Sequence, residues 1–383
     1  MATRRMVLGA GLGGLALVAT GATWRVTRVP KSAFEPWNIA ANEAAGDGAD
    51  VRLHAFRHAI LAPNPHNRQP WLIRLIGTNE ALITCDLERR LPVTDPFDRQ
   101  ITIGFGTFLE LARIAAAQVG IRMGMELFPD GEPEERLDSR PVARLTFTPD
   151  GTLAADPLFG QITQRHSNKE PYDLSRAVPD DLLRNIAKDG AEHSNDPAFL
   201  AQLRDVIQTA IEAEITSRPA YMESVDLMRI GHQQIDASPD GIDLSGPMIE
   251  AGQMLGLVNH EELADMESTA YGTGLTQLLE AYGSIPALMW ITTPGNSRSD
   301  QMEAGRAYVR ANLTATSHGL SMHPMSQSLQ EYREVAPMFA KVHELLGAEG
   351  ENAGKSRVQM LARVGYGPTI GPSPRWPMEA HLL

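Results

Sequence analysis

The spacing of apolar and polar positions predicts a chain that mixes helices and strands between residues 50 and 367. Apolar residues recur every three or four positions in "VRLHAFRHAILA" (51–62) and "FLAQLRDVIQTAIEAEIT" (199–216), which is typical of amphipathic helices. They alternate in "WLIRLIG" (71–77) and "ALITCDL" (81–87), and the turn residues between these segments predict a hairpin.

The order of further elements predicts an α+β fold. "TFLELARIAAAQVG" (107–120) is a helix that ends at a glycine, and "IRMGMELF" and "VARLTFTP" follow as strands. "SIPALMWITT" (284–293) and "SRVQMLARVGYG" (356–367) are predicted strands of the later part of the chain. Helices and strands therefore occur in both parts.

Two segments echo each other and predict two copies of one unit. "LARIAAAQVGIRMGME" and "VRANLTATSHGLSMHP" both end a helix in Gly, followed by Ile or Leu, any residue, and Met. We expect two degenerate α+β halves, residues 49–150 and 151–383, packed as an internal pseudo-dimer. Residues 235–283 carry Gly, Pro and Asp clusters between short helices, and are a candidate insertion or lid.

The N-terminus allows two interpretations. Gly9, Gly11 and Gly14 form a G-x-G-x-x-G pattern, which would open a Rossmann-type FAD protein, but a convincing strand neither precedes nor follows it. Paired arginines before an uncharged, Gly-rich stretch resemble a twin-arginine export signal instead. We expect residues 1–22 to be this signal, the twin-arginine translocase to be a transient partner, and the protein to be exported to the periplasm.

The N-terminal region allows one alternative and carries one further prediction. The signal could remain uncleaved as a membrane anchor, although it is short and Gly-rich for a spanning helix. Residues 23–48, with two prolines and "NEAAGDGAD", are predicted to be a linker.

Charge and cysteine content exclude several classes of function. The net charge of −13 argues against nucleic acid as a partner, and the single Cys85 excludes an internal disulfide and a Cys-rich metal site. His54 and His58 are four residues apart on a predicted helix, as zinc ligands can be. The sequence places no third ligand, so no metal site is predicted.

Two polar stretches carry the candidate chemistry. In "ITQRHSNKEPYD" (161–172), Arg165, Ser167 and Lys169 alternate, and a guanidinium, an ammonium and a hydroxyl together suit a phosphate. The alternative is a solvated basic loop. "APNPHNRQPW" (62–71) joins a helix to a strand and offers side-chain amides, and its alternative is a polar loop anchored by a tryptophan.

Together these stretches resemble the FMN-dependent nitroreductase family. "GRAYVRANLTATSHGLSMHP" and "ARVGYGPTIGPSPRWP" resemble its second long helix and its last strand with a C-terminal arginine, so the likeness covers most of residues 50–378. The resemblance implies FMN as the cofactor, and no catalytic side chain, because the flavin carries the chemistry. It implies cofactor contacts from phosphate-binding Arg165, Ser167, Lys169 and Arg375, pyrimidine-edge Pro63, Asn64, Asn67 and Gln69, and ring-walling Pro324 and Met325.

The distribution of the motifs resembles a fused pseudo-dimer of the mycobacterial Acg type. The first half lacks the R-x-S-x-K cluster, and the second half has "AEHSNDPAFL" where a Q-P-W loop would stand. This implies a monomer with a single FMN between its halves, and a flap that residues 235–283 could form.

The resemblance implies an oxidoreductase that reduces a small nitroaromatic or quinone-type acceptor from an unknown electron donor. The alternative is an FMN-binding or flavin-sequestering protein with little turnover.

Overall fold

Two antiparallel four-stranded sheets form the frame of the protein, as the α+β prediction required. The computed structural model describes residues 30–43, 50–348 and 356–383. The first sheet has the order β1 (Trp71–Ile76), β2 (Glu80–Cys85), β4 (Ala143–Pro149), β3 (Ile121–Leu127). The second has the order β5 (Glu192–Ser194), β8 (Ala287–Thr293), β10 (Arg357–Gly365), β9 (Ser321–Pro324).

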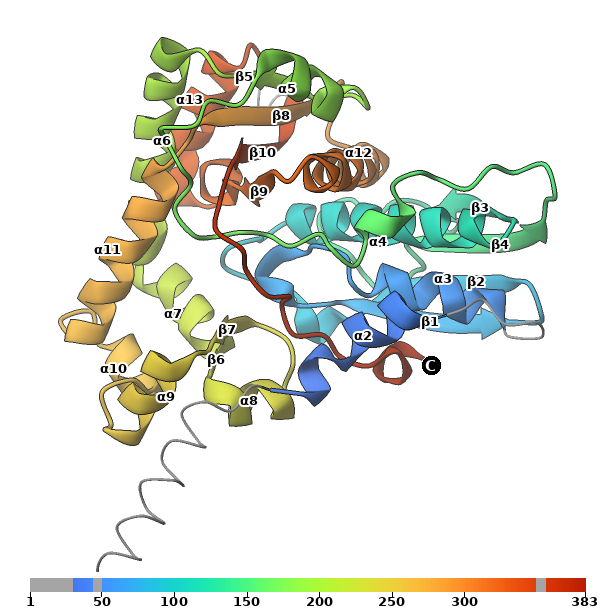
Figure 1. Cartoon of the computed structure of the whole chain (residues 1–383), viewed down its shortest axis with the longest axis horizontal. Helices are drawn as coiled ribbons and strands as arrows, with labels where there is room; N and C mark the ends of the chain where they lie inside the picture. The colour runs from blue at the N-terminus through green and yellow to red at the C-terminus, as the bar shows by residue number, and fades with distance from the viewer. Residues whose placement is uncertain (1–29, 44–49, 349–355) are drawn as a thin grey trace, which may run out of the picture.

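The two halves repeat the same order of elements. In each half a helix precedes two strands, and a longer helix then precedes two more, which gives the same order of strands in both sheets. These helices are α3 (Val51–Ala59) and α4 (Arg99–Gln118) in the first half and α5 (Asp180–Ala187) and α12 (Arg298–Ser317) in the second. Figure 1 shows the two halves side by side, with α4 and α12 between the sheets.

The long helices α4 and α12 cross at two glycines. A Cβ on Gly106 would lie 2.1 Å from the Met302 carbonyl oxygen, and a Cβ on Gly305 would lie 2.0 Å from the Ile103 carbonyl oxygen. The backbones approach closely because neither residue has a side chain. Each glycine also stands equally far before the glycine that ends its helix, so the crossing marks the centre of the internal repeat.

An insertion separates β5 from β8, at the place where the first half has only the Gly77–Asn79 turn. It starts earlier in the chain than residue 235, the start that the sequence predicted, and runs along the left side of Figure 1 from α6 at the upper left to α9 and α10 at the lower left. Its elements are α6 (Pro197–Thr216), α7 (Arg218–Leu227), β6 (Met228–Ile230), α8 (Gly231–Ala237), β7 (Ile242–Leu244), α9 (Pro247–Met254), α10 (His260–Ala264) and α11 (Thr269–Gly283).

Short 3₁₀ helices and one further α-helix complete the described chain. The α-helix is α13 (Ala336–Leu345), which lies between β9 and β10. The 3₁₀ helices are η1 (Ser32–Phe34), η2 (Pro65–Asn67), η3 (Leu87–Arg89), η4 (Phe159–Gln161), η5 (Ser326–Leu329), η6 (Arg333–Val335) and η7 (Met378–His381).

Part of the predicted linker is a packed helix, so that prediction was wrong for this stretch. Helix α2 (Glu35–Asn42) buries Trp37 and Ala40, and the Trp37 indole donates to the Ser373 carbonyl at 2.8 Å. Burial of a tryptophan stabilises such a short helix more than its own propensity does. The predicted signal, residues 1–22, and the Gly9–Gly14 pattern lie outside the described residues.

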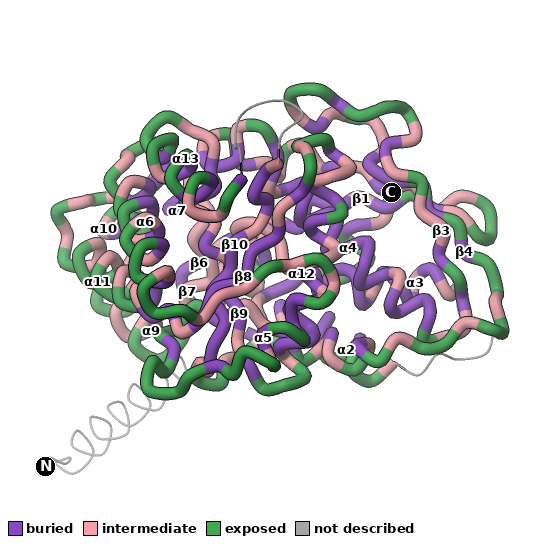
Figure 2. Tube along the Cα trace, turned by 90° about the horizontal axis from the view of Figure 1, so that it is seen from above, coloured by how far each residue is buried: buried purple, intermediate pink, exposed green. Residues whose placement is uncertain are grey.

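The C-terminal segment crosses from the second half to the first. After β10 the chain returns past α2, and the Leu383 amide donates to the Ile73 carbonyl at 2.9 Å beside β1 (Figure 1). The hydrophobic core extends along α4, and the trace of this helix in Figure 2 is almost entirely in the buried colour. Within the described residues, the helices are all too short or too polar to cross a membrane.

Candidate functional site

Two buried arginines from distant parts of the chain meet at one backbone carbonyl. Arg165 precedes β5 and Arg375 lies in the C-terminal segment, and they are 2% and 3% exposed. Each donates from its Nη2 atom to the Leu61 carbonyl at 3.2 Å. Two guanidinium groups of like charge therefore lie side by side at the end of α3.

The pair has no carboxylate partner at ion-pair distance within the described residues. Burial lowers the pKa of Arg165 to about 10. Burial, and then the neighbouring Arg165, lower the pKa of Arg375 to about 9. Two uncompensated buried cations cost several kcal/mol, which a bound anion would offset.

The described residues leave polar groups free beside this pair. Arg165 Nε and the hydroxyl of Tyr308 are buried without a hydrogen-bond partner. Tyr308 lies on α12, where burial raises the pKa of its hydroxyl and the nearby Arg165 lowers it. A ligand with several acceptor oxygens would satisfy both groups.

Lys169 extends the positive charge toward the 63–69 loop and β9. Its ammonium has neither a hydrogen bond nor an ion pair with any residue that the structure describes, and Ser167 pairs with Met322 as an isolated bridge. Burial, then Lys169, lowers the pKa of His66 to about 4. Burial, then Arg363 and Lys169, hold the pKa of His323 well below its usual range. Both imidazoles are therefore neutral neighbours of the cations.

One acidic side chain faces the cluster from the insertion. Asp243 lies on β7, and burial raises the pKa of its carboxyl, whereas Lys169 and Arg375 lower it. It makes no ion pair with either residue within 4.0 Å in the described structure. Asp243 therefore balances the positive charge only at a distance.

The loop between α3 and β1 is held in a strained conformation. His66, Asn67 and Gln69 have φ angles of 47°, 51° and 51°, which residues other than glycine rarely adopt. Such strain concentrates at functional sites, where the surroundings impose it. Here the backbone amide of Gln69 donates to Asn64 Oδ1 at 2.8 Å, and the Thr107 hydroxyl donates to the Pro63 carbonyl at 2.7 Å.

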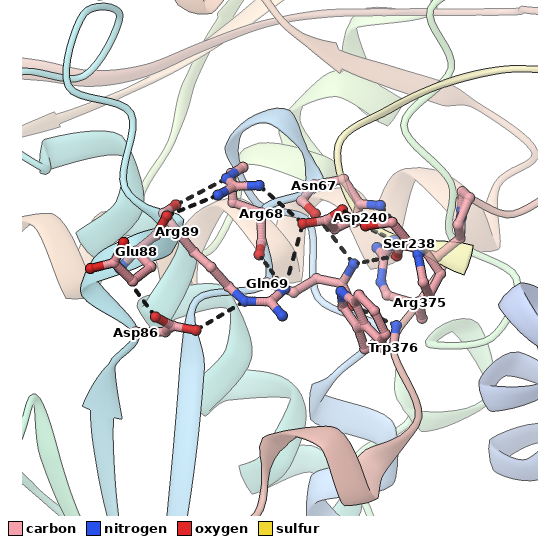
Figure 3. Close-up of polar contacts among 12 residues, drawn as sticks. Asn67, Arg68, Gln69, Asp86, Glu88, Arg89, Ser238, Asp240, Arg375 and Trp376 are labelled. Carbon is pink, nitrogen blue, oxygen red and sulfur yellow. Dashed lines mark hydrogen bonds and ion pairs between the residues drawn. The ribbon is translucent and has the colours of Figure 1, made fainter. Parts of the chain in front are cut away.

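The side chains of Asn67 and Gln69 bind the protein itself, so the expectation that their amides face the flavin edge is corrected. Asn67 accepts from Arg375 Nη1 at 2.7 Å and donates to the Pro374 carbonyl at 2.9 Å. Gln69 accepts from the Trp376 amide at 2.9 Å and donates to the Pro239 carbonyl at 2.8 Å (Figure 3). Both side chains thus position Arg375 and its neighbours.

The insertion is fastened to this loop by a buried ion cluster, which we call the latch. Asp240 accepts from Arg68 at 3.0 Å and from Arg229 at 2.9 Å, and Arg89 approaches it to 3.7 Å (Figure 3). The Gly241 amide also donates to the Asn67 carbonyl at 3.3 Å. The latch holds residues 238–241 against the loop, on the side where Asp243 approaches the arginine pair.

Of the two residues predicted to wall the ring, one is placed elsewhere. Met325 is fully buried in the hydrophobic core of the second half, so that expectation is corrected. Its backbone amide donates to the Leu361 carbonyl at 2.8 Å, and its side chain packs in this core. Pro324 ends β9 and is half-buried, and its contact with the cofactor stays a prediction.

Sequence reasoning missed the contribution of Trp37. The Arg375 guanidinium lies 5.3 Å from its ring centre, and the His166 ring packs against it edge-on at 5.4 Å. Cation–π contact partly compensates the Arg375 charge. The signal was a lone tryptophan within a Pro-containing segment, which by itself indicates burial and not a site.

Glu43 lies beside His54 and His58 and supplies the third group that the sequence could not place. Its carboxylate is already bonded to Arg57 and, at 3.2 Å, to His54 Nδ1, while His58 Nδ1 bonds the His54 carbonyl at 2.9 Å. These contacts join α2 to α3, and the group serves as a structural ion-pair cluster.

Comparison with known proteins identifies relatives of this chain. No family model matches the chain. It is 24% identical over 360 residues to a protein of Mycobacterium tuberculosis strain H37Rv that carries a provisional NAD(P)H nitroreductase name, an alignment that covers 89% of this chain and 95% of the relative. The similarity supports a place in the nitroreductase-like superfamily.

A second protein of that strain, provisionally named as the NAD(P)H nitroreductase acg, is 32% identical over 126 residues, covering 32% of this chain and 38% of the relative. A solved structure described as a nitroreductase from Anabaena variabilis has a TM-score of 0.36 and 14% identity, covering 76% of this chain and 69% of its own. An FMN-dependent nitroreductase from Mycobacterium smegmatis has a TM-score of 0.31 and 15% identity, with 54% and 86% covered. TM-scores this low carry no argument, so the relation rests on the curated sequences.

Proposed function

We propose that the protein is an FMN-dependent oxidoreductase of the nitroreductase type. The observation that carries the proposal is the pair of buried guanidinium groups at the Leu61 carbonyl, which lacks a carboxylate partner in the described structure. A phosphate dianion would neutralise Arg165 and Arg375 and accept from the free Arg165 Nε. Ser167 and Lys169 come from the same segment and would complete the clamp.

The relatives support a nitroreductase-type activity, and the choice of FMN among phosphate-bearing ligands follows from the resemblance of the sequence motifs to that family. The protein of M. tuberculosis that aligns along almost its whole length is named as an NAD(P)H nitroreductase. A bound flavin would supply two-electron transfer at its ring, while this chain holds the phosphate, orients the ring and excludes water. Pro63, Asn64 and Pro324 remain the predicted contacts of the ring and its edge.

The finer features of the proposal rest on the repeat. Because Arg165 and Arg375 belong to the second half and Leu61 to the first, one clamp is assembled across the two halves. We therefore propose one FMN per chain, a monomer of the Acg type and a nitroaromatic or quinone-type acceptor. Export through the twin-arginine translocase to the periplasm is proposed from the N-terminal sequence alone.

The latch favours a second candidate, a flavin-holding protein with little turnover. Asp240 is buried and Arg68 is half-buried, so the insertion is tied to the loop by an ion pair that is costly to separate. A fixed cover would keep NAD(P)H and bulky acceptors from the ring, because hydride transfer needs reacting atoms about 3–3.5 Å apart.

One experiment separates the two candidates. The protein is loaded with FMN, reduced photochemically under argon, and mixed with menadione or a nitroaromatic compound while the flavin absorbance is followed. An oxidoreductase returns the absorbance at a rate that rises with acceptor concentration. A rate that does not depend on the acceptor favours the flavin-holding protein, and failure to take up FMN rejects both candidates.

A further inference from the structure

Half of the large apolar side chains that are exposed in the described chain lie in one stretch of the insertion, residues 248–257. Eight such side chains are exposed, and four of them belong to α9 and the turn that follows it. We call these four the apolar tip: Met248, Met254, Leu255 and Leu257, which are 82%, 44%, 73% and 62% exposed. Single exposed apolar residues are ordinary, but a contiguous group marks an interaction surface.

The polarity of α9 is the reverse of that of a surface helix. Glu250 is the only acidic or basic residue between Leu244 and His260, and it is 2% exposed. Its carboxylate accepts from the His232 backbone amide at 2.6 Å and contacts His232 Nδ1 at 2.8 Å. A helix on a water-facing surface directs its charges outward and its apolar residues inward. In α9 the charge faces in and the methionines face out.

We propose that the apolar tip inserts into the surface of a lipid bilayer. The first described residues lie next to the same part of the insertion, because the Ser32 hydroxyl donates to Asp236 on α8 at 2.7 Å. Helix α8 also carries His232, to which Glu250 fastens α9. The described chain therefore begins beside α8, the helix to which α9 is fastened.

The N-terminal sequence fits this occupant. Residues 6–20 are uncharged and moderately apolar, so a membrane could hold them while the rest of the protein stays outside. The ten or so residues between them and Pro30 can span at most ~35 Å when fully extended. A chain held in this way would keep the apolar tip within reach of the same membrane.

Charge selects the kind of lipid surface. The stretch 244–259 contains neither Lys nor Arg, and the whole chain has a net charge of −13. The apolar tip itself therefore offers no attraction to anionic lipids, and its insertion would depend on apolar area. Binding to uncharged phosphatidylcholine should consequently be insensitive to salt, unlike the electrostatic docking of a basic surface. The inference does not depend on the proposed flavin chemistry.

The test uses the full chain with a polarity-sensitive dye on a cysteine placed in the tip. Cys85 is buried, and burial raises the pKa of its thiol, so the natural protein offers no competing site for the label. Leu255→Cys carries the dye, and Leu174→Cys is the matched control, because Leu174 is 60% exposed and lies before α5, outside the insertion. Emission is recorded with phosphatidylcholine vesicles at low and high salt.

We expect the dye at position 255 to shift to the blue and brighten severalfold with vesicles at both salt concentrations, and the dye at position 174 to stay unchanged. Loss of the shift when Met248→Ser and Leu257→Ser are added would support insertion of the tip. No shift at position 255, or equal shifts at both positions, would overturn the proposal. A shift that grows with protein concentration and needs no vesicles would also overturn it, because a second copy would then cover the tip.

Discussion

Arg165 offers a test in which stability and ligand binding should change in opposite directions. Arg165→Met keeps the length of the side chain and removes its charge. Burial lowers the pKa of Arg165 from 12.5 to about 10, which corresponds to roughly 3 kcal/mol against the charged form in the folded protein. Replacement also removes the hydrogen bond to the Leu61 carbonyl, worth about 1 kcal/mol, although Arg375 still donates to that oxygen. The FMN-free variant should therefore be more stable by roughly 1–3 kcal/mol.

The pH at which this gain is measured follows from the direction of the shift. A lowered pKa in the folded state means that the unfavourable term is complete below about pH 10. It disappears only as the pH rises toward the value of the unfolded chain. Urea unfolding of flavin-free protein at pH 7 therefore detects the whole effect.

Binding should change the other way. Loss of a charge-assisted hydrogen bond weakens FMN binding by about 1.5–3 kcal/mol, which is roughly ten- to 150-fold in the dissociation constant. Riboflavin, which lacks the phosphate, should lose much less. Both constants are measured by flavin fluorescence during titration.

Arg99→Met is the matched control. Arg99 is also buried, but its Nε pairs with Glu331 at 2.9 Å. Its replacement removes one of the two arginine partners of Glu331, the other being Arg357, together with hydrogen bonds to the Leu329 and Gln359 carbonyls. The loss should destabilise the protein by about 3 kcal/mol. If Arg165→Met destabilises the protein as much as this control, or weakens FMN and riboflavin equally, the reasoning about an unpaired phosphate clamp is refuted.

Three further variants test neighbouring parts of the account. Asp243→Asn removes a negative charge beside the clamp and should tighten FMN binding by about 1 kcal/mol in calorimetric titration; weaker binding would contradict the assigned place of this carboxyl. Asp240→Asn breaks the latch to Arg68, so FMN should dissociate faster and NADPH should bleach the flavin faster in stopped flow; unchanged rates would remove the latch as the barrier. Gly305→Ala pushes a methyl group against the Ile103 carbonyl and should cost about 3 kcal/mol or more in urea unfolding; full stability would contradict the close helix crossing.

Local pattern was enough to predict most of the frame. The hairpin at Gly77–Asn79, the strands at 121–127 and 143–149, and the helices that end at Gly120 and Gly319 were all predicted and are all present. These elements have a strong hydrophobic period and clear stop signals, so tertiary contacts did not need to be known. The echo between the halves likewise corresponds to equal positions in two sheets of the same order.

The fold brings some of the predicted site residues together and occupies others with contacts inside the protein. Arg165, Ser167 and Lys169 were assigned to a phosphate from charge and spacing, and Arg375 from the family resemblance; the fold brings the two arginines to one carbonyl. Asn67 and Gln69 were assigned to the cofactor because they offer side-chain amides and lie in a loop that resembles the N-x-Q-P-W loop of the family. Only the fold shows that the C-terminal segment and the insertion occupy those amides first.

The remaining errors share one physical cause, which is contact between segments far apart in sequence. Helix α2 was taken for linker because its stabilising partner, Ser373, lies at the other end of the chain. Met325 was taken for a wall of the ring because it follows Pro324 in the segment that resembles the family, whereas its side chain lies in the core. The insertion was placed too late because α6 has the same amphipathic pattern as a helix of the repeated unit.

The identity and amount of flavin released from the purified full chain test the central claim most directly. The protein, loaded with flavin by its host or by added FMN, is denatured, and the released cofactor is identified by chromatography and counted against protein concentration. The account predicts FMN at one molecule per chain, because one phosphate clamp is assembled from Arg165 and Arg375 across the two halves. Release of FAD, a count of two per chain, or protein that neither contains nor takes up FMN would contradict it.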